Sequence, residues 1–368
     1  MKGRRSDARA RSVVGAGLVL AVLMAAPNVA RCGVKVFETE GHTLELGFRL
    51  QPRMELDHVL VGGITDGQRD FMIRRARFKA NGKMKTASYG FEWKIDQTDQ
   101  NGITPSAAVE NAWIQFVLGG GVEMRAGLYD QPFSRDRLTS DSKQLAVDRG
   151  DVSGVPDGLG LADNATGFQL MGKGYQGRTP WAVGLFDNRR IAGRYQDRPM
   201  VVGRLDVNFG STKDVFQDAH FGTDRWYSLG VNGSFQQIEN VANTDSAAYS
   251  AVGGDGMLDV PVGAGRLFVK GEANVVKVDP SGAGPSIETK VWMVGAGFLV
   301  LQERLQPFAR FDETRFDTAV GGGKRDVTYV GMNYYLKGHS LKLQGDVRLQ
   351  ANTSESVDGA RLQAQMDF

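Results

Sequence analysis

Long apolar runs, cysteine and clustered histidine are all scarce in this chain of 368 residues. Beyond residue 30 no apolar stretch approaches the roughly 20 residues of a membrane-spanning helix. Together with a mean hydropathy of -0.28, this excludes a bundle of transmembrane helices. A single cysteine, Cys32, excludes a disulfide framework. The four histidines are scattered without the spacing of a metal site: His42, His58, His220 and His339.

Signatures of catalysis are also missing. The chain contains no Gly-x-Ser-x-Gly nucleophile elbow and no phosphate-cradling P-loop. We therefore predict no enzyme, no cofactor and no metal. The net charge is +2, but the first 30 residues hold five basic residues and one acid, so the remainder is near −2. Any preference for anions must come from where the charges lie, and no nucleic-acid partner is expected.

The N-terminus has the features of a secretory signal. Basic residues precede an apolar stretch at 13–26, and small residues end at Ala30, a plausible cleavage point. Asn28 fits poorly three residues before that point, so the cleavage position stays open. Arg31 stands before Cys32, where a lipoprotein needs a small residue. We predict a signal peptide at 1–30 and one domain at 31–368.

What recurs in the rest of the chain is strict alternation of apolar and polar residues. Tyr89, Phe91, Trp93 and Ile95 alternate with polar residues or glycine, and Val122 to Leu128 follow the same rule. A period of two indicates a strand with one apolar face, and about ten residues let a tilted strand cross a bilayer. We predict sixteen strands: 43–56, 71–84, 86–97, 108–118, 122–130, 165–175, 179–187, 199–209, 224–236, 246–259, 265–278, 289–300, 305–314, 325–337, 340–349 and 359–368.

The predicted connections alternate in length, as an outer-membrane barrel requires. Short links fall at 118–122, 175–179 and 337–340. Long loops are predicted at 57–70, 98–107, 131–164, 188–198, 237–245, 279–288, 315–324 and 350–358. The exception is 210–223, which is long where a short turn is due and could hide a wrongly placed strand. The final strand ends on Phe368, which resembles the signal that the outer-membrane assembly machinery reads.

The second predicted strand carries a row of basic residues. Arg75, Arg77, Lys79 and Lys83 share one face, Met72, Ala76, Phe78 and Ala80 share the other, and Arg74 lies near an end. A charge facing lipid at the midplane costs about 2–4 kcal/mol, so the basic row should face the lumen. There it would attract anions and pass them between successive sites. The alternative is that acidic side chains neutralise the charge of this row, since Glu92 and Asp96 lie on the next strand.

The longest predicted connection, 131–164, needs a reason for its length. Folding into the pore to narrow it is one such reason, and a plain extracellular loop is the alternative. Its basic residues are Arg135, Arg137, Lys143 and Arg149.

These segments resemble the phosphate-selective porins O and P. The resemblance rests on residues 127–140 with Gln131-Pro-Phe-Ser134, on Arg149, on Arg74-Arg-Ala-Arg77 and on 329–344, and it extends over nearly the whole mature chain. The family implies a sixteen-stranded barrel, usually trimeric, in the outer membrane of Gram-negative bacteria. It also implies a third loop that narrows the pore and basic residues that conduct anions.

The resemblance also assigns positions. Arg74 and Arg75 match the paired arginines of the family's constriction, Ser140 matches a serine of its loop, and Arg137 falls near a loop lysine. Asp141 stands where phosphate-binding members carry a second serine, and an acid there would repel phosphate. The candidate pore residues are Arg74, Arg75, Arg77, Arg137, Ser140, Lys143 and Arg149.

The sequence therefore predicts one transmembrane antiparallel β-barrel of about sixteen strands with loop 131–164 folded into its lumen. We expect passive diffusion of small solutes with a preference for anions such as phosphate. The expected partners are outer-membrane lipid, small anions and further copies in a homotrimer. The alternative is a structural or adhesive barrel whose lumen the loop occludes. We expect Arg74 or Arg75 to face the same narrow stretch of lumen as Arg137 or Lys143.

Overall fold

The computed structural model describes residues 33–61, 64–96, 106–187, 198–213, 215–238, 247–281, 284–351 and 356–368. The predicted signal peptide at 1–30 lies outside these residues. So do all or part of the predicted loops at 57–70, 98–107, 188–198, 237–245, 279–288 and 350–358.

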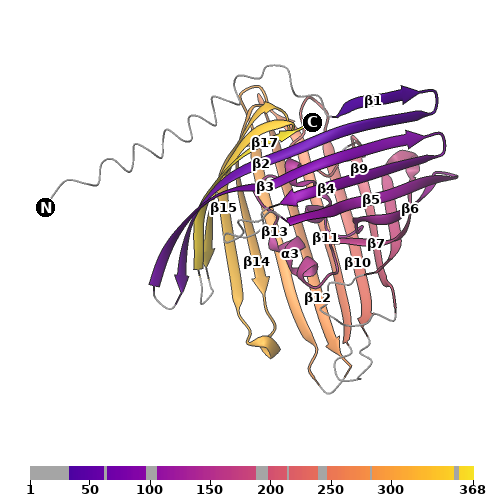
Figure 1. Ribbon diagram of the computed structural model, residues 1–368. Coiled ribbons are helices and arrows are strands. Elements are labelled where there is room, and N and C mark those ends of the chain that lie inside the picture. The colour runs from indigo at the N-terminus through magenta and orange to yellow at the C-terminus, as the bar shows by residue number, and fades with distance from the viewer. Residues whose placement is uncertain are drawn as a thin grey trace.

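Strands dominate the described chain (Figure 1). Their bounds are β1 Val34–Thr39, β2 His42–Val61, β3 Ile64–Met84, β4 Ala87–Asp96, β5 Ser106–Gly119, β6 Val122–Asp130, β7 Asn164–Gly174, β8 Thr179–Asp187, β9 Met200–Gly210, β10 Trp226–Ile238, β11 Ala247–Val262, β12 Gly265–Pro280, β13 Ile287–Leu299, β14 Leu305–Arg315, β15 Lys324–Lys337, β16 Leu341–Ala351 and β17 Ser356–Asp367. Among the residues that the structure describes, no helix is long and apolar enough to cross a membrane.

The sixteen strands β2 to β17 close into a barrel, which confirms the predicted fold. Each pairs antiparallel with the next in the chain, and β17 returns to pair with β2. At this seam the Phe48 nitrogen donates to the Phe368 oxygen at 2.7 Å, and the Phe368 nitrogen donates back at 3.0 Å. Closure gives each of the strands β2 to β17 a neighbour on both sides, which matters because backbone groups have no water to bond inside a bilayer.

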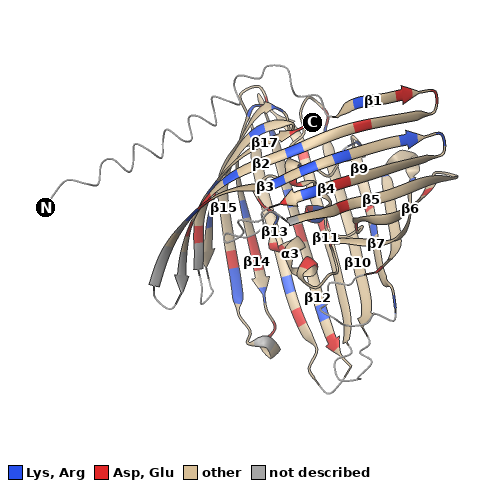
Figure 2. Ribbon diagram, viewed as in Figure 1, with Lys and Arg blue, Asp and Glu red and all other residues tan. Residues whose placement is uncertain are grey.

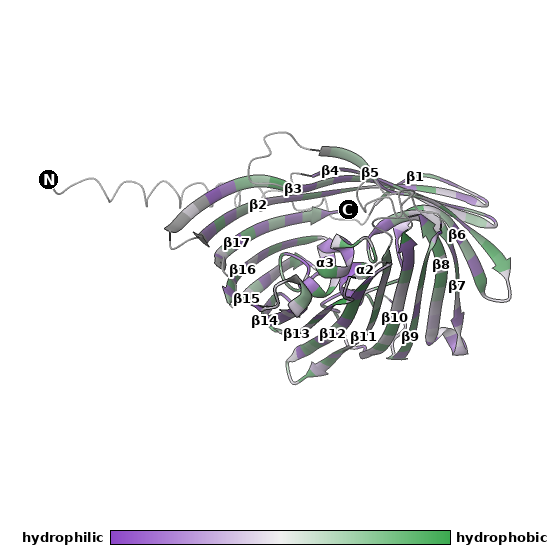
Figure 3. Cartoon of the chain, turned by 90° about the horizontal axis from the view of Figure 1, so that it is seen from below, coloured by the Kyte–Doolittle hydropathy of each residue, from purple (hydrophilic) through white to green (hydrophobic). Residues whose placement is uncertain are grey.

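The two faces of the barrel wall differ as the alternation predicts. On β10, Leu229, Val231 and Phe235 are half or more exposed on the outside. The residues between them, such as Ser234 and Gln236, point inward and are buried. Apolar residues alternate with polar ones along the other strands as well (Figure 3). The outer face therefore suits lipid and the inner face suits polar groups or water.

One strand was not predicted. β1 forms a hairpin with the beginning of β2, pairing Thr39 with His42 and Val34 with Leu46. Gly41 takes a φ of +97° in the tight turn between them, a conformation that side chains rarely adopt. β1 pairs with the part of β2 that extends beyond the end of β17.

The predicted loop 57–70 is wrong, because β2 and β3 continue through most of it as one long hairpin. The register shifts where Gln51 faces Arg75 and Pro52 faces Ile73, so Arg74 is the extra residue of a β-bulge in mid-strand. Ile73 is exposed on the outer face. Two predictions are corrected: the bulge moves Met72 off the outer face, and Arg74 lies in mid-strand because β3 begins at Ile64.

The segment 211–225 between β9 and β10 is also corrected. Its described residues, 211–213 and 215–225, form no strand, and they fold back into the lumen from the short-turn end of the barrel. Its residues Asp218 and His220 are almost fully buried. The His339 imidazole, from the turn after β15, contacts the Ala219 oxygen at 2.9 Å. Contacts between a turn and the barrel interior leave no pattern in the hydropathy of the sequence. The unusual length of this turn therefore suggested a misplaced strand.

Candidate functional site: the loop inside the barrel

The longest connection, 131–163, contains three short helices. These helices are α2 Arg135–Leu138, η1 Asp141–Lys143 and α3 Asp151–Gly158. Figure 3 shows two of them, α2 and α3, inside the ring of strands. Ser134 caps α2, because its hydroxyl accepts a hydrogen bond from the Arg137 nitrogen. Apart from this cap, the loop is held mainly by side chains of the barrel wall.

Apolar contacts fix the loop against one side of the lumen. Phe133 and Leu161, from its two ends, are fully buried in a cluster with Tyr129 of β6 and Met200 of β9. Each such side chain contributes about 1.5–3 kcal/mol on burial. Leu145, near the loop centre, packs in a second cluster with residues of β10, β11, β12, β14 and β15. The loop is thus a packed part of the interior rather than a solvated surface loop.

Buried ion pairs hold the loop on the same side. The Arg135 Nε lies 2.6 Å from Asp255 of β11. The Lys270 ammonium of β12 lies 2.9 Å from Asp136 and 2.7 Å from Asp218. Burial opposes ionisation of Asp136, but Lys270 and other groups outweigh it and lower its pKa to about 2. Asp136 is therefore a fixed anion that ties the loop to the wall.

The predicted basic row meets the loop at one carboxylate. Arg75 Nε lies 3.0 Å and Arg77 Nη2 3.5 Å from Asp141 Oδ2. Arg149, from the loop itself, pairs with the other oxygen of Asp141. Burial would raise the pKa of Asp141, yet the three guanidinium groups hold it well below its usual range. We call Arg75, Arg77, Arg149 and Asp141 the Asp141 cluster.

Basic segments recur along β2 and β3 (Figure 2), yet most of the charge is matched. Arg77 also pairs with Glu92, Asp96 and Glu110. This balance by acids is the alternative that the sequence left open for the row. Arg53 of β2 pairs with Asp148 of the loop at 2.8 Å. Positive residues on the wall therefore hold acidic residues of the loop.

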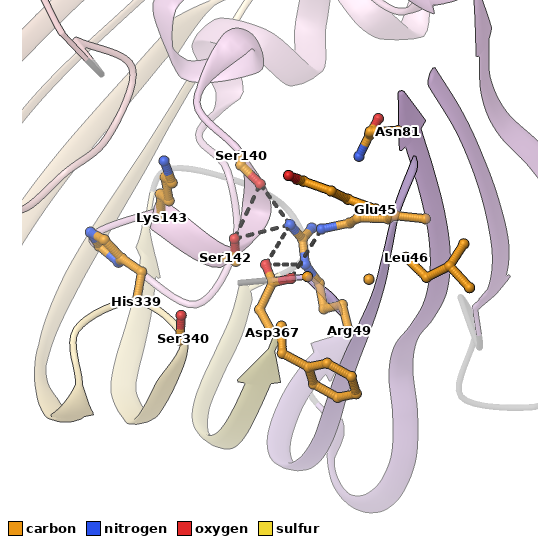
Figure 4. Close-up of a pocket in the computed structure, with 14 residues that line it drawn as sticks. Glu45, Leu46, Arg49, Asn81, Ser140, Ser142, Lys143, His339, Ser340 and Asp367 are labelled. Atoms are coloured by element: carbon orange, nitrogen blue, oxygen red, sulfur yellow. Dashed lines mark hydrogen bonds and ion pairs between the residues drawn. The ribbon is translucent and has the colours of Figure 1, made fainter. Parts of the chain in front are cut away.

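Ser140 and Lys143 border a cavity of about 380 Å³ between the loop and the β2–β3 wall. The Arg49 guanidinium donates to the hydroxyls of Ser140 and Ser142 at 3.0 Å each and pairs with Asp367 at 2.8 Å (Figure 4). The Lys143 side chain lines the same cavity, and no described residue forms an ion pair with it.

The other two predicted residues lie elsewhere. Arg137 is directed to the base of the loop, where it contacts Asp130, Asp163 and Asn164. Burial would raise the pKa of the Asp148 carboxyl in the loop, but Arg53, Arg361 and Arg74 hold it well below its usual range. The structure thus brings Arg75, Arg77 and Arg149 together, and places Arg137 apart from them.

Several residues of this interior were missed by sequence reasoning. Arg49, Gln51 and Arg53 alternate on the inner face of β2, and their spacing of two could have been read as a second polar row. Asp218 and Lys270 left no such signal, because each matters only through a contact with a distant segment.

The closed sixteen-stranded barrel with a long connection inside it is the architecture of the outer-membrane porins. Within that class, residues 48–194 match the family model of phosphate-selective porin O and P. The match confirms the resemblance to that family over this part of the chain.

The chain is similar to proteins from several bacteria. A protein of Aquifex aeolicus (strain VF5), described as uncharacterized, is 23% identical over 381 residues, covering 91% of this chain and 89% of that protein. The anion-selective porin from Comamonas acidovorans matches with a TM-score of 0.64 at 14% identity, over 88% of this chain and 100% of that one. The trimer form of OmpT from Vibrio cholerae has a TM-score of 0.59 at 11% identity, over 89% and 100%.

The structural likeness shows a shared fold. With the family match, it places the chain in the outer membrane of a Gram-negative bacterium. The family that residues 48–194 match is one of porins, and the fold is shared with porins of known structure.

Proposed function

We propose that this chain is a channel for passive diffusion of small solutes with a weak preference for anions. The observation that carries the proposal is the Asp141 cluster. Three guanidinium groups from β3 and loop 131–163 converge on one carboxylate, two of them at 3.0 and 3.5 Å. Guanidinium groups in this arrangement suit oxyanions such as phosphate and carboxylates. Here the protein supplies its own oxyanion.

The internal carboxylate explains why the preference should be weak. An incoming oxyanion must compete with Asp141, which is tethered and already paired, so the site exchanges anions rather than trapping them. Conduction requires such weak binding, because a tight site would slow the release of the anion from the pore. In this proposal Arg74, Arg75, Arg77, Ser140, Lys143 and Arg149 line the narrow stretch, and Arg137 braces the base of the loop.

Reversal potentials test the proposal. The purified chain in a planar bilayer, under a gradient of potassium chloride, should pass chloride more readily than potassium. Asp141→Asn keeps the side-chain shape and removes the carboxylate that pairs with Arg75 and Arg149, so it should increase the preference for chloride. Its conductance in potassium phosphate should also saturate at lower salt than that of the parent. Glu40→Gln, in the exposed turn before β2, is the matched control.

A parent channel that prefers potassium would contradict the anion preference. An Asp141→Asn channel with the parent's selectivity and saturation would show that the cluster lies off the permeation path.

We also propose a homotrimer. The support is the family resemblance and the trimer form of OmpT, whose fold this chain shares. Light scattering of the detergent complex, corrected for bound detergent, should give three times the chain mass. A monomer mass under conditions that keep the barrel folded would contradict it.

One observation favours the alternative of an occluded structural barrel. The segment 211–225 meets loop 131–163 inside the lumen, where the Asp218 nitrogen donates to the Lys143 oxygen at 2.9 Å. If these two segments close the pore, the folded and inserted chain will carry no ion current at all. A conducting parent eliminates this alternative.

A further inference from the structure

Most arginines on the inner wall of the described barrel are neutralised by carboxylates. Arg204 lies 2.7 Å from Asp255, and Arg310 lies 3.0 Å from Asp312. Arg125 of β6 is different: no described acidic residue lies within ion-pair distance of it. The Glu123 carboxylate lies one hydrogen bond further away, where it accepts from the Gln115 Nε2 at 2.9 Å. A cation without a direct ion-pair partner keeps more of its field in the lumen than one in contact with a carboxylate.

Neutral and aromatic groups hold Arg125 instead. Its Nε and Nη2 both donate to the Gln115 Oε1, at 2.9 and 2.7 Å. Its guanidinium carbon lies 4.4 Å from the centre of the Trp113 ring and 5.4 Å from that of Tyr129. Stacking on these faces stabilises the cation without removing its charge. Among the described residues, none accepts a hydrogen bond from Nη1.

The position of Arg125 is on the lumen side of the wall. It shares a strand face with Tyr129, which packs against Phe133 of the loop. β6 begins directly after the short turn at 119–121, so Arg125 lies about 10 Å from that end of the barrel at the usual rise per residue. Its side chain is only half-buried. The guanidinium thus stands between the short-turn mouth and the base of loop 131–163.

We propose that Arg125 is a further selectivity residue, which attracts small oxyanions and carboxylates along the β5–β6 wall. The free edge of its guanidinium can donate to such an anion, while Gln115 keeps the group oriented without neutralising it. A unit charge about 7 Å from an ion in water changes the local ion concentration about threefold. This inference rests on the proposed function only in requiring a conducting channel.

The test measures the chloride-to-potassium permeability ratio from reversal potentials of the full chain in planar bilayers. Arg125→Gln should lower the ratio about threefold. Gln115→Glu should lower it similarly, because it gives Arg125 the carboxylate partner that the other arginines have. Arg125→Lys keeps the charge and should stay close to the parent. Arg315→Gln, an exposed residue at the end of β14, is the matched control and should have no effect.

Each outcome separates the two proposals. A parent that conducts but prefers potassium contradicts the proposed anion preference, while a further fall of the ratio in Arg125→Gln still supports the role of Arg125. Unchanged ratios in both Arg125→Gln and Gln115→Glu overturn that role, whatever the parent prefers. An equal fall in Arg125→Lys overturns it too, since loss of packing would then be the cause. A parent without current overturns both proposals.

Discussion

The carboxylate of Asp218 accepts a hydrogen bond from the backbone nitrogen of Leu145 at 2.8 Å. This contact joins two segments that enter the lumen from opposite ends of the barrel. Leu145 belongs to loop 131–163, which follows β6, and Asp218 belongs to 211–225, which follows β9 at the short-turn end. Leu145 and Val215 also share an apolar cluster. The interior is therefore braced from both sides.

Asp218→Asn should loosen this brace. The Leu145 nitrogen and the Lys270 ammonium both donate to the same oxygen, Oδ2 of Asp218. An amide keeps one acceptor oxygen but has no charge, so it loses the ion pair with the buried Lys270. We expect a lower unfolding temperature and larger current fluctuations in single-channel records. Asp224→Asn, at an exposed position of the same segment, should match the parent. Quiet, parent-like records from Asp218→Asn would show that the loop holds its position without this contact.

Arg137→Ala should act on stability rather than on selectivity. The Arg137 guanidinium contacts Asp130 at 3.2 Å and Asn164 at 2.7 Å, and it also pairs with the buried Asp163. Removing one partner of a buried ion pair costs about 3–5 kcal/mol, because the remaining charge stays buried. Thermal unfolding followed by circular dichroism measures the loss. A stable variant with reversed ion selectivity would instead place Arg137 at the constriction.

His339 should make the barrel sensitive to mild acid. Burial, with Lys342 and other cationic neighbours, holds the pKa of His339 well below its usual range. The unfolded chain takes up a proton near pH 6.5, whereas the folded chain does so only at lower pH. Stability is thus lost as the pH falls below about 6.5, by about 1.4 kcal/mol per pH unit between the two pKa values.

His339→Gln removes this proton and isolates its effect. The difference in unfolding free energy between parent and variant should shift in favour of the variant as the pH falls from 7.5 towards about 5. A difference that does not change with pH would mean that His339 titrates normally in the folded chain.

Gly47→Ala should damage the closing seam of the barrel. A Cβ at Gly47 would lie 2.7 Å from the backbone oxygen of Phe368, which is itself bonded to the Phe48 nitrogen. Two paired backbones cannot separate without breaking that bond, so we expect less folded protein in the outer membrane. Gly233→Ala is the control, since its nearest neighbour would lie at 3.8 Å. Equal yields of the two variants would show that the seam adapts.

The strands could be predicted from the sequence because their signal is local. Lipid on one side and a polar interior on the other select a residue type at every second position, so Tyr227, Leu229 and Val231 indicate their strand by themselves. The bulge at Arg74 escaped prediction, because the identity of the extra residue depends on the register with β2.

The length of loop 131–164 already indicated that it enters the lumen, and its basic residues indicated the chemistry. The partners of those residues were decided only by the tertiary structure. Asp141 meets Arg75 and Arg77 across more than sixty residues of chain, and Asp218 meets Leu145 across more than seventy. Alternation orients a side chain toward the lumen, but the closed barrel determines which charge stands opposite. Arg77 shows the difference, because Glu92 and Asp96 lie on the neighbouring strand, whereas Asp141 reaches Arg77 only because the loop folds into the closed barrel.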